Sequence, residues 1–575
     1  MSWIIKNYIK ETRENETGAQ VYPPGLRHPV AFIYPNVYHL GMSNLGMHIL
    51  YQMINERGDS ACERFFLPDK RLQQEHIKSK TPLLSLENQR PLADFDVIFV
   101  MLSFEMDYDN LLTVLDLGNI RLRAAERNQR EPLVIIGGPC ATFNPEPMAA
   151  VADAFVIGEG EETVQHVLDT IYREESKQER LAALAQVPGV YVPSLYTAQY
   201  DDEGEFTALL PQEGAPAKVA RQWARDIDAY PHTSAIVTSG TEFEDMFIVE
   251  VARGCGRPTR SHCRFCMAGY CFRKPRPRKL ENILADIAKR PERTKKVGLM
   301  GAAVSDHPQM AELTEYLVEH KIPFSVASMR ADMLTEQIAH ALAQSGQRTM
   351  TVAPEAGSER MRAAINKGIT EEHVYNSIEL AAAAGMRNIK LYYMIGLPGE
   401  KDEDIVETVE MIKRVRAKMD AVGNKGELVI SVNGFVPKPF TPYQWAPLCN
   451  VRTLKKRFKI LSDGLKKEKR IKLITESLKE TVVQSVLARG SRRIGEALLK
   501  AHVEGRSLKQ VLKEEGLDAE ELAGRELHPG QPLPWQHLDM GVTQEYLAAE
   551  LQRSESGKFT PMCFDGCRRC GVCRE

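Results

Sequence analysis

Three closely spaced cysteines constrain this chain more than any other feature of its sequence. Cys255, Cys263 and Cys266 have the spacing C-x7-C-x2-C, and the branched apolar run at residues 247–251 leads into the first of them as a buried strand would. Three thiolates hold three corners of a [4Fe-4S] cube and leave its fourth iron open. A structural zinc site has four protein ligands, and an ordinary electron-transfer cluster has four cysteines. The spacing therefore predicts an iron–sulfur site whose open iron binds a small molecule, with a structural zinc site or isolated thiols as the alternative.

Strand-like and helix-like segments alternate after the cysteines. The strand-like runs lie at residues 296–300, 323–327, 349–352, 388–394 and 428–432, and amphipathic segments lie at 279–289, 310–320, 335–343, 371–384 and 403–417. With the run before Cys255, this makes six βα-type units. The pattern predicts an α/β fold with a parallel sheet and helices outside it.

Glycine-rich and polar turns follow these strands. In chain order they are Gly301-Ala302-Ala303, Ser328-Met329-Arg330, the segment from Pro354-Glu355 to Arg362, Gly396-Leu397-Pro398-Gly399-Glu400 and Asn433-Gly434-Phe435. Taken singly, each has a structural alternative: Ser358 is a candidate helix cap, and Lys390 with Glu355 is a candidate ion pair. Their order and their positions at strand ends, all after the cysteines, favour one joint site.

The cysteine motif together with these turns resembles the radical S-adenosylmethionine (SAM) superfamily. The resemblance implies a partial (β/α)6 TIM-type barrel in which SAM chelates the open iron. One electron from the cluster then cleaves the sulfonium to a 5′-deoxyadenosyl radical. The first gap of the motif is longer here than is usual, so Pro258, Thr259 and Arg260 are expected beside the open iron. SAM contacts are expected from Phe265, Gly301, Ala302, Ser328, Arg330, Glu355, Arg362, Lys390, Ile395 and Gly396.

A second α/β pattern precedes the barrel. Its strand-like runs are 30–34, 97–102, 133–136 and 154–157, and its helical stretches are 45–55, 110–117 and 162–172. This predicts a small doubly wound, Rossmann-like domain that binds a ligand at the carboxyl edge of its strands.

The glycine-rich loops of that second pattern resemble the cobalamin-binding domain that precedes many radical SAM barrels. The cobalamin signature is Asp-x-His-x-x-Gly, and the matching segment here is Asn36-Val37-Tyr38-His39-Leu40-Gly41, with Tyr38 at the cobalt-ligand position. Either cobalamin binds without a protein histidine, or the domain serves substrate contact or scaffolding. Cobalamin contacts are expected from Tyr38, Gly41, Ser103, Gly137, Gly138, Gly158 and Glu159.

Four more cysteines lie close together near the end of the sequence. Cys563, Cys567, Cys570 and Cys573 have the spacing C-x3-C-x2-C-x2-C. Four thiolates without a histidine indicate a second [4Fe-4S] cluster, with zinc as the alternative. With the N-terminal motifs, this tail resembles a subgroup of cobalamin-domain radical SAM proteins.

The predicted organisation has six parts. They are an extension at 1–24, a Rossmann-like cobalamin-binding-type domain at 25–200, a linker at 201–240, a radical SAM barrel at 241–450, a helical region at 451–545 and a cysteine-rich metal-binding tail at 546–575.

Composition limits the partners and the compartment. The formal net charge is −3, so no general attraction to nucleic acid or membrane is expected, and the basic stretch at 455–472 is interpreted as a solvated helix face. No apolar run approaches the roughly 18 residues of a spanning helix, and the N-terminus has no signal-peptide pattern. The 11 cysteines are clustered, which favours metal ligation in a reducing cytoplasm.

The leading functional hypothesis is a radical SAM transferase that methylates an unactivated carbon of an unknown substrate with the help of cobalamin. Its expected partner is a reducing electron donor such as flavodoxin or ferredoxin. One alternative is methylthiotransferase-like sulfur insertion that uses the C-terminal cluster. Another is a non-catalytic iron–sulfur electron carrier or redox sensor.

Overall fold

The N-terminal domain is a parallel sheet with helices on both faces. The computed structural model describes residues 1–241, 244–255, 262–564 and 566–573. The sheet has the strand order β3-β2-β4-β5-β6-β7, and only β7 is antiparallel to its neighbour. These strands are β2 His28–Tyr34, β3 Ser60–Phe66, β4 Val97–Met101, β5 Leu133–Gly137, β6 Ala154–Val156 and β7 Val190–Tyr191. Because β2 lies between β3 and β4, the chain reverses direction across the sheet there, which opens a crevice at the carboxyl edge.

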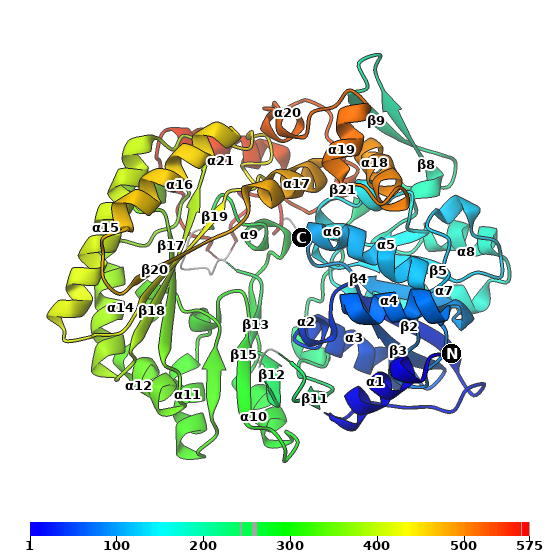
Figure 1. Ribbon diagram of the computed structural model, residues 1–575, viewed down its shortest axis with the longest axis horizontal. Coiled ribbons are helices and arrows are strands. Elements are labelled where there is room, and N and C mark those ends of the chain that lie inside the picture. Colours follow the sequence, from blue (N-terminus) through cyan, green and yellow to red (C-terminus); the bar gives the residue numbers. More distant parts are fainter. Residues whose placement is uncertain (242–243, 256–261, 565, 574–575) are drawn as a thin grey trace.

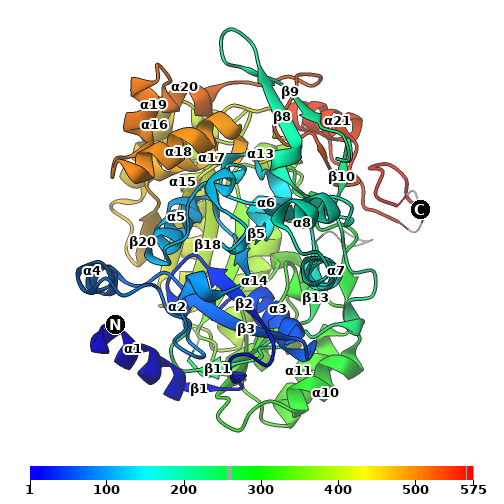
Figure 2. The ribbon, with the colours of Figure 1, turned by 90° about the vertical axis from the view of Figure 1, so that its right-hand side faces the viewer.

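Amphipathic helices cover the two faces of this sheet (Figure 2). Apolar residues of α5, Tyr108–Leu117, pack on one face, and those of α3, Leu45–Glu56, and α7, Gly160–Arg173, pack on the other. The shorter helices of this domain are α1 Trp3–Glu14, α2 Tyr38–Gly41, α4 Lys70–Ser79, α6 Pro139–Phe143 and α8 Lys177–Leu184. The predicted doubly wound domain is confirmed.

Strand β3 is absent from the prediction because its sequence carries charged residues. Arg64 is 1% exposed and forms ion pairs with Glu16 at 2.7 Å and Glu87 at 2.6 Å. A buried ion pair of this kind breaks the apolar pattern by which a strand is recognised, although its charges are compensated in three dimensions.

The central domain is the predicted partial barrel. Its strands are β12 Met246–Glu250, β15 Lys296–Met300, β16 Phe324–Val326, β17 Thr349–Glu355, β18 Asn388–Ile395, β19 Leu428–Gly434 and β20 Ile471–Thr475. They form parallel sheets β12-β15-β16 and β17-β18-β19-β20, and a hydrogen bond of 3.2 Å from Met329 N–H to the Thr351 carbonyl bridges the two. The outer helices are α10 Leu280–Ala288, α11 Met310–Glu319, α12 Glu336–Gln344, α14 Glu371–Ala383 and α15 Asp402–Ala421 (Figure 1).

The barrel sheet continues past residue 450, into the stretch interpreted as helical. Strand β20 adds to β19, with Leu428 opposite Ile471. Lysines precede this strand and lie within it, so its short alternation of apolar and polar residues is not recognisable in the sequence. The lysines of the basic stretch are exposed, as predicted, but Arg457 is 7% exposed and pairs with Glu400 at 2.9 Å.

Helices of the C-terminal region connect the two domains (Figure 1). They are α16 Val451–Leu465, α17 Leu478–Arg489, α18 Arg492–Val503, α19 Leu508–Glu514, α20 Ala519–Gly524 and α21 Gln544–Glu555. A hairpin of β8 Tyr196–Tyr200 and β9 Phe206–Pro211 spans the predicted boundary between the N-terminal domain and the linker. Within the linker, β10 Val219–Ala220 pairs with β21 Leu538–Asp539. Among the described residues, none of the helices is long and apolar enough to cross a membrane.

A histidine between two carboxylates makes the contact of α18 with α5 sensitive to pH. His502 lies 2.8 Å from Asp109 and 2.9 Å from Asp116. Burial alone would lower the pKa of His502, but the two carboxylates raise it to about 9. Because the folded pKa lies above the unfolded value of about 6.5, this contact stabilises the fold fully below pH 6.5 and is lost as pH rises through 9.

His502→Gln is therefore expected to remove a stabilisation of about 1 kcal/mol near pH 6 and to change little above pH 9.5. Thermal denaturation at several pH values measures this. The exposed His528 provides the control substitution, His528→Gln. An equal loss of stability at pH 6 and pH 9.5 for His502→Gln would contradict the assignment.

Candidate functional site

The three cysteines of the central motif lie together at the rim of the barrel. Cys255 follows β13, Ala252–Arg253, and Cys263 and Cys266 lie on the returning loop. Burial and the neighbouring thiols of Cys263 and Cys266 raise the pKa of the Cys255 thiol to about 12. Burial and Cys263 raise the pKa of Cys266 to about 11. The three thiols therefore interact electrostatically with one another, and a cation bound by them would relieve this repulsion. Residues 256–261, with Pro258, Thr259 and Arg260, lie outside the described residues.

Cationic side chains face the three thiols. Lys367 acts electrostatically on Cys266, and Arg330 acts on Cys255. Lys367 forms an ion pair of 3.1 Å with Glu355, and Arg330 forms one of 3.1 Å with Asp332. The site can therefore balance the charge of several thiolates.

A cavity of about 390 Å³ lies between the N-terminal domain and the barrel. Its N-terminal wall includes Leu45, Gly46, Ile49, Met101, Gly137, Gly138, Val156, Gly158 and Glu159, and its barrel wall includes Glu250, Ala252, Arg253, Gly254, Gly301 and Ala302. The first wall is the carboxyl edge of the doubly wound sheet, and the second wall is the segment that leads into Cys255. The cavity therefore joins the predicted ligand edge to the cysteine site.

Two glycines of the wall are required by the backbone. Gly138 and Gly158 have φ values of +96° and +105°. A Cβ atom would come within 2.8 Å of the Leu102 carbonyl oxygen at Gly138 and within 2.1 Å of the Gln222 carbonyl oxygen at Gly158. Only glycine fits such positions without displacement of the loops.

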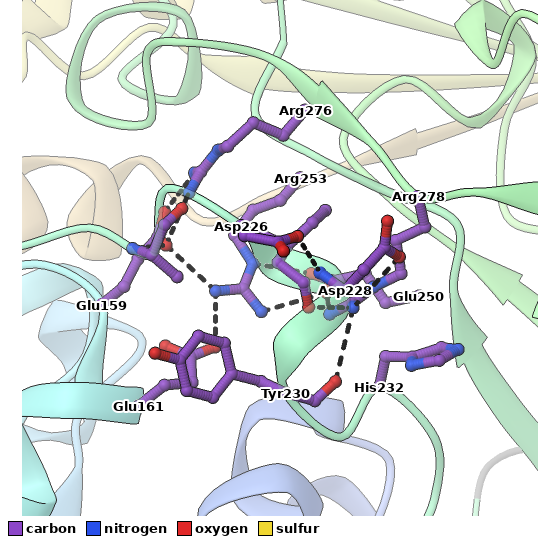
Figure 3. A network of polar contacts seen from close by, with 12 residues as sticks. Glu159, Glu161, Asp226, Asp228, Tyr230, His232, Glu250, Arg253, Arg276 and Arg278 are labelled. Carbon is purple, nitrogen blue, oxygen red and sulfur yellow. Dashed lines mark hydrogen bonds and ion pairs between the residues drawn. The ribbon is translucent and has the colours of Figure 1, made fainter. Parts of the chain in front are cut away.

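An ion-pair network, whose members Glu159, Glu161, Glu250 and Arg253 line the cavity, ties the two domains together (Figure 3). Arg253 pairs with Glu159 at 3.1 Å, with Glu161 at 2.5 Å and with Glu250 at 2.9 Å. Burial alone would raise the pKa of Glu250, but Arg253 and Arg278 hold it at about 2. Arg253 is two residues from Cys255, so this network fixes the cysteine loop against the N-terminal domain.

Comparison with known proteins decides the family. The model for "Radical SAM proteins, N-terminal" matches residues 46–193, and the model for "Radical SAM superfamily" matches residues 249–412. An uncharacterized protein of Methanocaldococcus jannaschii is 31% identical over 473 residues, which cover 82% of this chain and 90% of the relative. The chain belongs to the radical SAM superfamily.

Other similar proteins are more distant. The tRNA-2-methylthio-N(6)-dimethylallyladenosine synthase of Carboxydothermus hydrogenoformans is 26% identical over 183 residues, which cover 29% of this chain and 40% of the synthase. Among solved structures, the radical SAM methyltransferase TsrM from Kitasatospora setae, with cobalamin and a [4Fe-4S] cluster bound, has a TM-score of 0.50. At 13% identity, the match covers 83% of this chain and 100% of that one. This likeness concerns the fold.

The radical SAM family implies a [4Fe-4S] cluster and SAM. The chemistry of the donor set fits, since three mutually close thiols face cationic groups. Cys271 is 0% exposed and packs in a hydrophobic cluster, so it is not placed as a fourth ligand. Within the described residues no group of three His, Cys, Asp or Glu side chains is already gathered as metal ligands.

Several predicted SAM contacts lie at this radical SAM rim. Gly301 and Ala302 are exposed on the cavity wall, and Ser328 is exposed after β16. Phe265 packs against a small apolar cluster that includes Leu397, Phe435 and Tyr443. The remaining rim residues are Arg330, Glu355, Ile395 and Gly396, where Gly396 has a φ of +92° and its N–H donates to Glu400 at 2.7 Å.

Two residues predicted to contact SAM, Arg362 and Lys390, have other neighbours in the structure. Arg362 is 5% exposed, and its guanidinium donates to the carbonyls of Ala356 and Gly357. It therefore stabilises the backbone of the turn after β17. Lys390 lies over the Tyr392 ring at 4.7 Å, and the alternative ion pair with Glu355 is wrong because Glu355 pairs with Lys367. Ser358 does cap a helix, by accepting a hydrogen bond from the Met361 N–H.

The predicted cobalamin contacts divide into two groups. Gly137, Gly138, Gly158 and Glu159 line the cavity. Three others do not, which corrects the prediction: the Tyr38 hydroxyl donates to Glu16 at 2.7 Å, Gly41 packs against Phe66, and Ser103 hydrogen-bonds Tyr34. The signature segment has turned away from the cavity because Glu16, itself buried by Arg64, holds Tyr38.

Sequence reasoning missed the residues that hold the site from a distance. Arg264, between Cys263 and Cys266, is 0% exposed and pairs with Glu550 of α21 at 3.1 Å. The Asn366 amide donates to the His262 carbonyl at 2.9 Å and accepts from the Thr560 N–H at 3.1 Å. The sequence offered one indication of these contacts, the position of Arg264 inside the cysteine motif. It gives no indication that Glu550 is the partner of Arg264.

Proposed function

We propose that this radical SAM enzyme binds cobalamin in the cavity between its two domains and transfers a methyl group to an unactivated carbon of its substrate. The observation that carries the proposal is the cavity itself, because its walls combine the glycine loops of the doubly wound sheet with the segment leading into Cys255. Ligands of such sheets bind at this edge.

The residues present fit a cobalamin held without a histidine. The N-terminal wall of the cavity is apolar and glycine-rich, with Leu45, Ile49, Met101 and Val156 among its residues. Tyr38, at the position of the usual cobalt ligand, is engaged with Glu16 instead. The fold likeness to a methyltransferase solved with cobalamin bound supports the same assignment.

Cys255, Cys263 and Cys266 would hold the [4Fe-4S] cluster. Arg330, now paired with Asp332, and Glu355, now paired with Lys367, would orient SAM by charge and hydrogen bonding. When bound, the cluster supplies the electron that cleaves SAM, and cobalamin supplies a methyl group. The expected redox partner is a one-electron donor of the flavodoxin or ferredoxin type. Arg253 and its carboxylates keep the loop of Cys255 facing the cavity.

We also propose a second [4Fe-4S] cluster at Cys563, Cys567, Cys570 and Cys573. Cys567 and Cys570 are 7% and 6% exposed, so the tail is folded rather than loose. The tail spacing C-x3-C-x2-C-x2-C is the reverse of the C-x2-C-x2-C-x3-C spacing of bacterial [4Fe-4S] ferredoxins.

Sulfur insertion is the second candidate. The tail of this chain lies against the cysteine loop through Arg264 and Thr560, and some relatives carry a methylthio-synthase name. A methylthiolated product rather than a methylated one would favour it.

Gly137→Trp tests the cobalamin site. A Cβ atom at Gly137 would meet only Val156, at 3.8 Å, so a large side chain grows into the cavity without backbone strain. We expect cobalamin affinity to fall at least about tenfold, or about 1.4 kcal/mol, as measured by cobalt content and the visible spectrum after anaerobic loading. Gly137→Ala is the matched control and should bind as the unmodified chain does. Unchanged cobalt binding by Gly137→Trp would exclude this cavity.

A further inference from the structure

Among the described residues, one buried arginine near the tail lacks a well-formed hydrogen bond at both terminal nitrogens of its guanidinium. Arg273 is 3% exposed, and its Nε donates to the Gly269 carbonyl. Within the part of the chain that the structure describes, neither Nη1 nor Nη2 makes a well-formed hydrogen bond, and the Tyr546 hydroxyl is a looser partner of the guanidinium. A buried cation without an anion is strongly destabilising, so a folded chain that keeps one normally supplies a compensating negative charge.

The surroundings of Arg273 show where that charge belongs. The guanidinium carbon lies 4.8 Å from the ring centre of Tyr270 and 5.5 Å from that of Tyr546. The groups around it that can become anionic are, in order of their electrostatic effect on the guanidinium, Tyr546, Tyr270, Cys570 and Cys563. Because Tyr546 lies in the first turn of α21, where the Thr543 N–H donates to the Cys570 carbonyl, Arg273 lies beside the part of α21 that contacts the tail.

The tail is held in place on this side. The Thr543 N–H, at the start of α21, donates to the Cys570 carbonyl at 3.0 Å, and the Arg569 Nε lies 3.3 Å from the Cys567 sulfur. A Cβ atom at Gly571 would lie 2.7 Å from the Gly541 carbonyl oxygen, so the tail backbone is packed closely against the segment before α21. The cysteines thus lie at a defined place opposite Arg273.

The same arginine is connected to the first cysteine site. It holds the carbonyl of Gly269, and the Gly269 N–H donates to the Cys266 carbonyl at 3.2 Å. From the other direction, Thr560 contacts Arg264 beside Cys263 and is three residues from Cys563, a separation that spans at most about 11 Å. The two groups of cysteines are therefore neighbours.

We infer that Arg273 is the positioning residue and counter-charge of an anionic four-thiolate iron–sulfur cluster in the tail, and that it joins this cluster to the loop of Cys266. The inference rests on the proposed second cluster. Four thiolates leave such a cluster negatively charged in both redox states, so the nearby cation stabilises it, and most strongly the reduced state.

The test uses the full chain with Cys255, Cys263 and Cys266 all replaced by alanine, so that iron reports the tail alone. In this background Arg273→Gln should lower the midpoint potential of the tail cluster by about 59 mV, a tenfold change in the reduction equilibrium. Arg273→Lys should restore most of it. The exposed Arg568, within the same tail, gives the control Arg568→Gln, for which little change is expected. Potentials come from redox titration followed by electron paramagnetic resonance.

Zinc instead of iron in the tail, or an equal potential for Arg273→Gln and the parent, would overturn the inference. If Arg273→Gln does not fold, a second variant removes the tail cluster itself. This variant keeps Cys255, Cys263 and Cys266 and carries Cys567→Ser together with Cys570→Ser. The resonance spectrum of the first cluster should then change, and an unaltered spectrum would contradict the connection. Neither readout depends on SAM cleavage or cobalamin, so failure of the proposed methyl transfer remains distinguishable.

Discussion

Replacement of Cys255 by alanine is expected to slow the formation of 5′-deoxyadenosine at least about a thousandfold, which corresponds to about 4 kcal/mol in the activation barrier. The three thiols of the motif are mutually close and face Lys367 and Arg330. Removing one leaves two ligands for a cluster that needs three, so the iron to which SAM binds is lost or displaced. The measurement is product analysis after anaerobic reconstitution with SAM and dithionite.

Cys62→Ala is the matched control for this change. Cys62 is buried in the core of the N-terminal domain, away from both cysteine groups, and its replacement should leave the rate nearly unchanged. Retained cleavage in Cys255→Ala would exclude this cysteine as a ligand. SAM affinity that survives the same change unaltered would favour a role that does not depend on chelation by iron.

The second large effect is expected at Arg264. Its side chain and that of Glu550 are 0% and 1% exposed and pair at 3.1 Å. Arg264 also donates to the Lys558 carbonyl at 2.7 Å and to the Thr560 hydroxyl at 2.9 Å. Without Arg264, the buried Glu550 keeps only the partly exposed Arg553 as its cation, and the loss of a buried partner costs up to about 3–5 kcal/mol. Arg264→Gln should therefore lower the free energy of unfolding by that amount and release the tail.

The chain provides a close control on the same carboxylate. Arg553 pairs with Glu550 at 2.7 Å, but its side chain is 39% exposed, so Arg553→Gln should cost at most about 1 kcal/mol. Anaerobic denaturation with limited proteolysis of residues 556–573 measures both effects. Equal costs for the two arginines would show that Arg264 does not anchor the tail.

How far the sequence could predict the fold depended on periodicity. Strands β15, β17, β18 and β19 were found because their apolar residues recur with at most one charged residue in each strand. Strand β3 was missed because Arg64 and Glu63 lie within it, and β20 because it is embedded among lysines. In both cases the charged residues are accommodated by partners far away in the sequence. A local sequence pattern contains no information about those partners.

The site divides in the same way. Gly137, Gly158 and the motif cysteines were predictable, since backbone turns and metal ligands leave local signatures. Tyr38 was placed wrongly because matching a signature assumes the orientation of its loop, which Glu16 determines here from elsewhere in the chain. The Arg264–Glu550 pair joins residues 286 positions apart, and only the fold brings them together.

Metal analysis of the anaerobically purified and reconstituted chain tests the central claim most directly. Two [4Fe-4S] clusters and one cobalamin predict about eight irons and about one cobalt per chain, with no zinc. Iron should fall by about half when Cys563 and Cys567 are replaced. A chain that holds no iron at Cys255, Cys263 and Cys266 after reconstitution would contradict the account.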